Sequence, residues 1–296
     1  MKDFDFIAVG DIVTDAFIRL KDASVHCTID KEKCELCMRF GDKIPYEFVE
    51  VVPSVGNSPN AAVSAARLGL KTGLVTDLGE DRIAEDSITV LKSNRVDTSF
   101  VQLHDGLQSN YHYVLWYEDD RSILVKHFDY PYKFPDIGSP KWVYLSSIGE
   151  SSLPYHKEIV NHLKKNPKIK LAFQPGTFQM KFGVSKLREI YQLTEVFFCN
   201  VQEAQRILNS EEKSIGRLLR LMHDEGPKTV VITDGPRGAY AYDGKEMWFM
   251  PPYPDPKPPL ERTGAGDAFA STFTSALALG KSLPEAMMWG PVNSMS

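Results

Sequence analysis

The sequence predicts an α/β fold built on a doubly wound, mostly parallel sheet flanked by helices. Its short apolar runs, rich in β-branched and aromatic residues, are continuous rather than alternating, which is typical of strands covered on both faces. Helical segments separate these runs, and the alternation of strand with helix favours a parallel sheet. The expected strands are residues 4–10, 73–76, 142–145, 170–173, 195–198 and 229–232, and the expected helices are about 58–68, 82–94, 154–165, 202–208 and 214–224.

Two segments interrupt this alternation and predict a small sheet that projects from the main one. Residues about 16–52 are charged and irregular, and residues about 99–128 contain two alternating runs, 110–117 and 122–128, on either side of a turn. Alternation around a turn is typical of an antiparallel hairpin with one face in water. Because there is no internal repeat and no long linker, we expect residues 1–296 to form a single domain with these two segments inserted in it.

The composition excludes several classes of function. The chain has 296 residues, of which 43% are hydrophobic and 25% charged, as expected of a globular protein with a sizeable core. Its formal net charge of −5 gives no electrostatic reason to expect a nucleic-acid partner. No apolar run approaches the ~18 to 20 residues that a membrane span needs, and the N-terminus lacks a signal peptide's apolar core. We therefore expect a cytoplasmic protein without a membrane partner.

Three of the four cysteines lie close together in the sequence, at Cys27, Cys34 and Cys37, and Cys199 lies far from them. In a cytoplasmic chain of this size we expect reduced thiols. Cys34-x-x-Cys37 has the spacing of a zinc site, and with Cys27 and His26 nearby four ligands can just be assembled. Free thiols in a surface segment are the favoured interpretation, with zinc as the alternative.

The most informative segment is the run Gly264-Ala265-Gly266-Asp267, which precedes a helix expected to begin at about Asp267 and to end at Gly280. A glycine turn that leads into a helix exposes unpaired backbone N–H groups at the positive end of the helix dipole, which makes an anion site. Glycine is needed because a Cβ would block the close approach of a phosphate. The segment therefore predicts a phosphate site.

A carboxylate within an anion site has two interpretations. Asp267 either caps the helix, as aspartate commonly does, or takes the proton of a hydroxyl that attacks the bound phosphate. Other segments favour the second. Asn57 and Asn60 stand near the start of a helix of small residues and are suited to bind hydroxyls. Two polar segments, 200–203 and 233–238, follow buried strands at the edge where open α/β sheets bind ligands.

Taken in order along the chain, five motifs resemble those of the ribokinase-like sugar kinase family, also called the PfkB family. They are Gly10-Asp11-Ile12-Val13-Thr14-Asp15, Gly56-Asn57-Ser58-Pro59-Asn60, Asn200-x-x-Glu203, Thr233-x-Gly235-x-x-Gly238 and Gly264-Ala265-Gly266-Asp267. The last motif is highly specific, and the series covers nearly the whole chain. The resemblance implies a doubly wound sheet with a small β-sheet lid, and an ATP-dependent kinase that phosphorylates a hydroxyl of a small sugar or sugar-like molecule.

The resemblance also implies a role for each matching residue. Asp267 is expected to be the catalytic base, with Gly264, Ala265 and Gly266 as the anion hole around the transferred phosphoryl group. The residues expected to hold the substrate hydroxyls are Asp11, Asp15, Gly56, Asn57 and Asn60. The residues expected at ATP are Asn200, Glu203, Thr233, Gly235, Gly238 and Asn293, with Glu203 near Mg²⁺, largely through water. The lid is expected to close over the site and exclude water.

The sequence departs from the family pattern at three places. Glu261-Arg262 stands where the family usually has Asp-Thr before the glycine motif, and Asn57 replaces the second of two glycines at the substrate helix, which leaves the substrate open. The chain stops at Ser296, soon after a helix that starts near Ser282, whereas family members generally continue with further helix that completes the adenine pocket. A truncated chain with weaker ATP binding is one interpretation of this end.

Alternatives to a sugar kinase rest on the same segments. A nucleoside kinase shares the scaffold, and the aromatic residues of the segment 111–117 can stack on a base or a sugar, although a small lid core explains them as well. A non-catalytic binding protein usually lacks the base, and Gly10 is not followed by a dinucleotide fingerprint. The histidines His104, His112, His127 and His156 are scattered, and we assign them no metal role. Lid edges can pair between subunits, so a homodimer is plausible.

Overall fold

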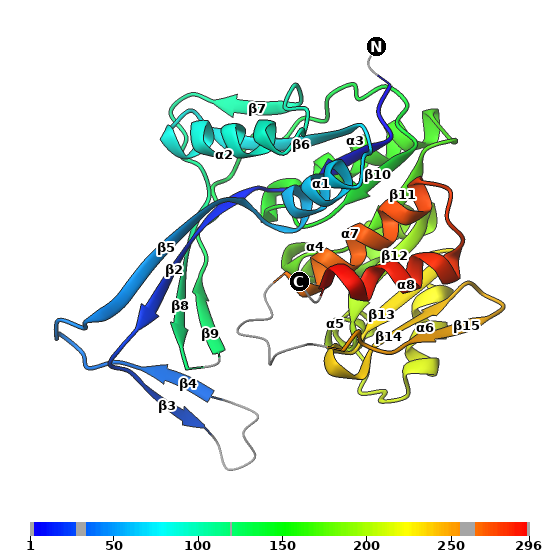
Figure 1. The fold of residues 1–296 in the computed structure, drawn as a ribbon. Helices are drawn as coiled ribbons and strands as arrows, with labels where there is room; N and C mark the ends of the chain where they lie inside the picture. Colours follow the sequence, from blue (N-terminus) through cyan, green and yellow to red (C-terminus); the bar gives the residue numbers. More distant parts are fainter. Residues whose placement is uncertain (1–2, 28–33, 119, 255–263, 295–296) are drawn as a thin grey trace.

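The computed structural model describes residues 3–27, 34–118, 120–254 and 264–294, and a nine-stranded sheet with helices on both faces dominates these residues (Figure 1). The strand order is β15-β14-β13-β12-β11-β10-β1-β6-β7. The β13–β14 and β14–β15 pairings are antiparallel, and the other pairings are parallel. The strands are β1 (Phe6–Val9), β6 (Thr72–Gly79), β7 (Val101–His104), β10 (Trp142–Leu145), β11 (Lys170–Phe173), β12 (Thr194–Asn200), β13 (Thr229–Thr233), β14 (Ala239–Tyr242) and β15 (Met247–Met250).

Two hydrophobic cores lie on opposite faces of this sheet, as the continuous apolar runs predict. Phe6 and Ala8 of β1 pack into one core, and Ile7 and Val9 of the same strand pack into the other. The first core takes side chains from α1 (Asn57–Arg67), α2 (Arg82–Ser93), α7 (Ala265–Ala278) and α8 (Leu283–Ser294). The second core takes side chains from α3 (Leu153–Lys165), α4 (Thr177–Leu193), α5 (Val201–Leu208) and α6 (Ile215–Asp224). The doubly wound prediction is therefore confirmed.

The point where the sheet reverses its direction of growth positions the site. From β1 the chain proceeds to β6 and β7 on one side, and then returns to β10 on the other side of β1. Ligands of open α/β sheets bind outside the carboxyl ends of the strands at such a point. Gly10 follows β1 there in a backbone conformation with φ of 157°, and an added Cβ would lie 2.4 Å from the Ser58 Oγ. Glycine thus allows α1 to approach the end of β1.

The projecting sheet has four strands in the order β5-β2-β8-β9, and Figure 1 shows it reaching away from the main body. Its strands are β2 (Val13–Leu20), β5 (Tyr46–Val55), β8 (Tyr111–Tyr117) and β9 (Asp120–Leu124). The predicted hairpin is confirmed, because β8 and β9 pair antiparallel, although β9 ends at Leu124 rather than at 128. Within the segment 99–128, β7 pairs with β6 in the main sheet, so the projecting part of that segment is shorter than predicted.

Several elements were not predicted from the sequence. Helix α4 is kinked at Gly183, where φ is 77°. The kink interrupts the helical pattern of the sequence, so the pattern did not predict a helix there. Strands β14 and β15 are short and partly exposed, with alternating burial at the antiparallel edge of the sheet. The expected final helices exist, but α7 begins at Ala265, two residues before the predicted start at Asp267.

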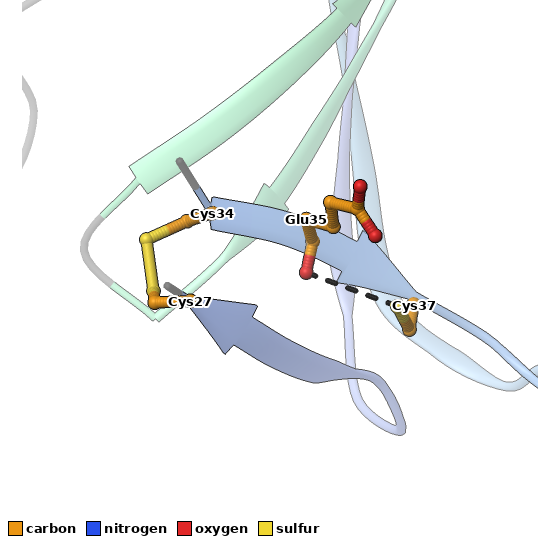
Figure 2. Close-up of a disulfide and its surroundings, with 4 residues drawn as sticks. All are labelled: Cys27, Cys34, Glu35 and Cys37. Carbon is orange, nitrogen blue, oxygen red and sulfur yellow. Dashed lines mark hydrogen bonds between the residues drawn. A yellow bond between two sulfur atoms is a disulfide. The ribbon is translucent and has the colours of Figure 1, made fainter. Parts of the chain in front are cut away.

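The expectation of reduced cysteines is wrong for two of them, because Cys27 and Cys34 form a disulfide (Figure 2). The strands β3 (Ser24–Cys27) and β4 (Cys34–Cys37) pair antiparallel in a register that sets Cys27 opposite Cys34, with 4.0 Å between their Cα atoms. This pairing removes two of the four ligands that the zinc alternative requires. In the part of the chain that the structure describes, Cys37 and Cys199 are free, and no group of three or more potential ligands surrounds a metal position.

None of the helices in the described ranges has the length and apolar character needed to cross a lipid bilayer.

Candidate active site

A cavity of about 390 Å³ lies between the carboxyl ends of the central strands and the projecting sheet. Its size is within the ~300 to 1,000 Å³ typical of small-molecule sites. Seven of the residues predicted to act in substrate binding or catalysis line it together: Asp11, Asp15, Gly56, Asn57, Asn60, Gly264 and Asp267. A second hollow of about 560 Å³, between α3 and residues 134–139, contains none of the predicted site residues.

Asp267 lies in the first turn of α7, and its carboxylate accepts hydrogen bonds from three side-chain amides. The Asn57 Nδ2 donates to Oδ1 at 2.8 Å, the Gln174 Nε2 donates to the same oxygen at 3.0 Å, and the Asn60 Nδ2 donates to Oδ2 at 3.2 Å. Burial raises the pKa of the Asp267 carboxyl, and the three amides act in the opposite direction because they stabilise the charged form. The result is a partly buried carboxyl group with a raised pKa at the wall of a cavity.

The start of α7 is open in the way that an anion site requires. Gly264 precedes the helix in the left-handed conformation, with φ of 79°, which glycine adopts without strain. A Cβ added to Gly264 or Gly266 would meet no atom of the described residues within 4 Å. The space beside the Cα atoms of these two glycines is therefore open, as far as the described residues show. Glu261, Arg262 and Thr263 lie outside the described residues.

Asn200 and Glu203 form a reciprocal cap at the start of α5, directly after β12. The Asn200 Oδ1 accepts from the Glu203 backbone N–H at 2.8 Å, and the Glu203 Oε2 accepts from the Asn200 backbone N–H at 2.9 Å. Burial raises the pKa of the Glu203 carboxyl, and the negative charge of Asp267 adds to this rise. The charge of Asp267 thus acts on a second, partly buried carboxyl group at the carboxyl ends of the strands.

The remaining residues expected at ATP lie near the end of β13 and on α8. Thr233 ends β13, and Gly235 and Gly238 flank a short turn in which Arg237 donates two hydrogen bonds to Asp234, at 2.7 and 2.6 Å. The Asn293 Nδ2 donates to the Thr272 Oγ1 at 2.8 Å, which fixes α8 to α7. Like Asn200 and Glu203, these residues do not line the 390 Å³ cavity, so they form a neighbouring region rather than one pocket with the substrate residues.

The cavity also contains polar residues that the sequence analysis did not select. His112 of β8 and His127 both line it, with their rings 5.1 Å apart. The His112 Nδ1 lies 3.4 Å from the Asp15 Oδ1, and the His127 Nδ1 lies 3.5 Å from the Asp11 Oδ2. The Tyr132 hydroxyl donates to both oxygens of Asp11, at 3.0 and 3.2 Å. The two histidines, scattered in sequence, are therefore brought together against the predicted substrate carboxylates.

Three buried polar atoms around this end of the cavity have no hydrogen-bond partner in the described part of the chain. They are the Asp15 Oδ1, the His112 Nε2 and the His127 Nδ1. Buried polar atoms without partners are costly and rare in folded proteins, and a ligand is a common explanation. A water molecule, an ion or a polar ligand would satisfy these three atoms.

Gln174 is the other residue that the sequence analysis missed. It follows β11 directly, at the same edge of the sheet as Asn200 after β12, so the rule that selected Asn200 also applies to it. For His112 and His127 the sequence offered no comparable signal, because alternation in a strand does not tell which face meets a cavity.

Comparisons with known proteins identify the family and agree with the fold. The model of the pfkB family of carbohydrate kinases matches residues 47–290. The chain is 31% identical over 241 residues to a cytidine kinase of Thermococcus kodakarensis, covering 79% of this chain and 84% of that protein. Its fold is similar to Arabidopsis thaliana ribokinase complexed with ribose and ATP, with a TM-score of 0.78 at 18% identity, covering 99% of this chain and 92% of the other. The nucleoside kinase of Methanocaldococcus jannaschii gives a TM-score of 0.76 at 17% identity, covering 100% and 92%.

Proposed function

Because the chain belongs to the pfkB family of carbohydrate kinases, we propose that it transfers the γ-phosphate of ATP to a hydroxyl of a small sugar or sugar-like substrate. One observation carries the proposal: Asp267, a carboxylate that lines the cavity, lies within the first turn of a helix whose N-terminus is suited to an anion. A base and a phosphate site at one place are what phosphoryl transfer to an alcohol needs.

The residues present fit a bound γ-phosphate. The open space beside Gly264 and Gly266 is a cradle that side chains would fill, and the backbone N–H groups of Ala265 and Gly266 are among those at the positive end of α7. These amides stabilise the charge that develops on the transferred group. We assign Thr233, Gly235 and Gly238 to the rest of the nucleotide site, while Asn293 contributes by holding α8 against α7.

Glu203 fits a role near Mg²⁺, directly or through water. Mg²⁺ prefers oxygen ligands such as carboxylates, and the buried carboxyl groups of Glu203 and Asp267 repel each other when both are ionised. A divalent cation relieves this repulsion and, when bound, neutralises phosphate charge. Asn200 supports this role by fixing the Glu203 side chain through the reciprocal cap.

The reaction then follows from the positions of the chain's own groups. Asp15 and Asp11 accept hydrogen bonds from substrate hydroxyls, and Asp267, which lines the same cavity, accepts the proton of the reacting hydroxyl. The hydroxyl oxygen forms a bond to the γ-phosphorus, the bond from phosphorus to the bridging oxygen breaks, and ADP leaves with that electron pair. The projecting sheet acts as a lid that excludes water, which would otherwise compete as the acceptor.

A nucleoside is the second candidate substrate, and two observations favour it. The cytidine kinase is 31% identical to this chain, and nucleosides contain the ribose hydroxyls that Asp11 and Asp15 are suited to bind. The imidazoles of His112 and His127 offer ring faces and polar nitrogens to a base at the same end of the cavity. A simple sugar needs only the carboxylates of Asp11 and Asp15. A nucleoside also uses the two histidines to bind its base.

A panel of substrates tests the proposal and separates the candidates. The chain is incubated with ATP, Mg²⁺ and either ribose, fructose, cytidine or uridine, and ADP release and phosphorylated product are measured. Product from at least one member is expected, and product that forms only with nucleosides selects the second candidate. Absence of product from a broad panel of sugars and nucleosides contradicts the proposal.

We also propose that the protein associates as a homodimer through the lid. The sheet carries exposed apolar side chains on β5 and β8, with exposed fractions of 52% at Val51 and 48% at Tyr113. Exposed strands and apolar side chains favour pairing between copies. Light scattering of the purified chain tests this, and a monomer at micromolar concentration contradicts it.

A further inference from the structure

We propose that Gln174 is a positioning residue for Asp267, completing with Asn57 and Asn60 an amide clamp that orients the carboxylate and leaves Oδ2 to take the substrate proton. The inference rests on the proposed function, in which Asp267 is the base. It concerns a residue that follows β11 and matches none of the five motifs. The clamp also gives a role to Asn57, which stands where the family usually has a glycine.

The hydrogen bonds distinguish the two carboxylate oxygens. Each oxygen of an ionised carboxylate offers about two lone pairs. Oδ1 uses both, because it accepts from Asn57 at 2.8 Å and from Gln174 at 3.0 Å. Oδ2 accepts from Asn60 at 3.2 Å, the longest of the three bonds, and retains a lone pair as far as the described residues show. The proton of an attacking hydroxyl therefore has its place on Oδ2.

Gln174 is itself held rigidly, which a positioning residue requires. Its backbone N–H donates to the Leu145 carbonyl at 3.0 Å, and the following Pro175 restricts its backbone to an extended conformation. Its Oε1 accepts from the hydroxyl of Tyr144, a fully buried residue of β10. Burial, and secondly the charge of Asp267, raises the pKa of the Tyr144 hydroxyl, so this group remains a donor. Because Tyr144 donates to the amide oxygen, the amide nitrogen must face Asp267.

The charges around Asp267 explain why such a clamp is useful. Burial raises the pKa of its carboxyl, and its negative charge in turn raises the pKa of Glu203 on α5. Other ionisable groups of the same cavity are Asp11, Asp15, His112 and His127. Each amide donor stabilises the ionised base and works against burial. Loss of one donor should therefore raise the pKa of the base and turn its carboxylate away from the productive orientation.

Gln174→Leu tests the inference because it removes the amide and keeps a side chain of similar volume. Turnover should fall about tenfold to a hundredfold, the range for a hydrogen bond to a charged group, while the KM for ATP stays unchanged. The acidic limb of the pH profile of kcat should move to higher pH, because a carboxylate with one hydrogen-bond donor fewer loses its proton at higher pH. Tyr144→Phe keeps the amide and should shift kcat and the limb in the same direction, by less. Gln102→Leu, which removes an amide bound to the Lys133 carbonyl outside the cavity, is the matched control.

The outcomes separate this inference from the proposed function. If Asp267→Asn retains normal turnover, the assignment of the base fails and the clamp has nothing to position. If Asp267→Asn is inactive but Gln174→Leu keeps the wild-type kcat and acidic limb, the inference alone is overturned. A fall in kcat without movement of the limb also overturns it, because that pattern indicates general structural damage. Should Gln174→Leu not fold, Tyr144→Phe decides by the same two measurements.

Discussion

Replacement of Asp267 by asparagine separates the chemical role of this residue from its structural one. In the folded chain, Asn57 and Gln174 donate to Oδ1, and Asn60 donates to Oδ2. An asparagine at 267 can keep its carbonyl oxygen toward the first two amides and turn its NH₂ toward Asn60. Rotation of the Asn60 amide then restores an acceptor at that position. The side chain stays in place, but the group that accepts a proton is gone.

The expected loss of turnover follows from the missing base. Positioned general bases contribute ~10² to 10⁴ in rate, so kcat should fall by that factor, equivalent to about 2.7 to 5.4 kcal/mol of transition-state stabilisation. The KM for ATP should change little, because the backbone N–H groups at the start of α7 are retained. The assay couples ADP release to a spectrophotometric readout, with the best acceptor from the substrate panel.

The thermal stability of Asp267→Asn should not fall with its turnover. Burial raises the pKa of the Asp267 carboxyl above its ordinary value of 3.8, so the folded chain binds this proton more tightly than the unfolded chain. Between those two pKa values the contribution of this group to the free energy of unfolding falls as pH rises. Asparagine has no such dependence. Asp267→Asn should therefore unfold at a temperature equal to or above that of the wild type at neutral pH, with the difference shrinking toward acidic pH.

Asp77→Asn is the matched control, because it changes a second buried carboxylate whose pKa burial raises. The Asp77 Oδ1 lies 2.7 Å from the His104 Nε2, outside the cavity. This variant should keep its turnover. The reasoning is refuted if Asp267→Asn remains within threefold of wild-type kcat, or if Asp77→Asn loses as much activity as Asp267→Asn.

Three further predictions follow from the same geometry. Glu203→Gln preserves the reciprocal cap of α5, so the thermal stability should not change. The Mg²⁺ concentration for half-maximal activity should rise about tenfold to a hundredfold. An unchanged Mg²⁺ titration contradicts a role of Glu203 near the metal. His112→Gln should raise the KM for the acceptor up to about tenfold with little change in kcat. His162→Gln, a change outside the cavity, should alter neither constant. If His112→Gln lowers kcat and leaves KM unchanged, His112 does not contact the substrate. We expect kcat and KM to stay unchanged when Cys27 and Cys34 are replaced by serine or when a reductant is added. The reason is that β3 and β4 lie at the far end of the projecting sheet (Figure 1). A loss of activity in either experiment refutes this expectation.

The sequence was sufficient for six parallel strands of the main sheet, β1, β6 and β10 to β13, because their signal is local. Continuous apolar runs such as 4–10 indicate strands covered on both faces, and both cores draw on neighbouring residues of β1. Which sheet a strand joins is not a local property. The alternation in the segment 99–128 could not show that β7 pairs with β6 rather than with the projecting sheet. Likewise, the disulfide depends on the β3–β4 register, which sets Cys27 opposite Cys34 and which spacing alone does not determine.

The site was predictable where one element supplied both the backbone and the chemistry. The glycine turn and Asp267 are consecutive, so their proximity needed no fold, and the edge rule for parallel strands brought in Asn200 and Glu203. His112 and His127 required knowledge of how the projecting sheet faces the main one. The sequence alone therefore could not place these two histidines at the cavity.

In the proposed function the start of α7 serves two negative groups, which gives a reason for the three amides that bind Asp267. The positive end of a helix dipole stabilises a carboxylate in the first turn and equally an incoming phosphate. An ionised Asp267 without partners would repel that phosphate and, being buried, would favour its protonated form. Asn57 and Gln174 bind Oδ1 and stabilise the negative charge, while Oδ2 remains available to the acceptor hydroxyl. The replacement of a family glycine by Asn57 thus bears on the ionisation of the base, and not only on the choice of substrate.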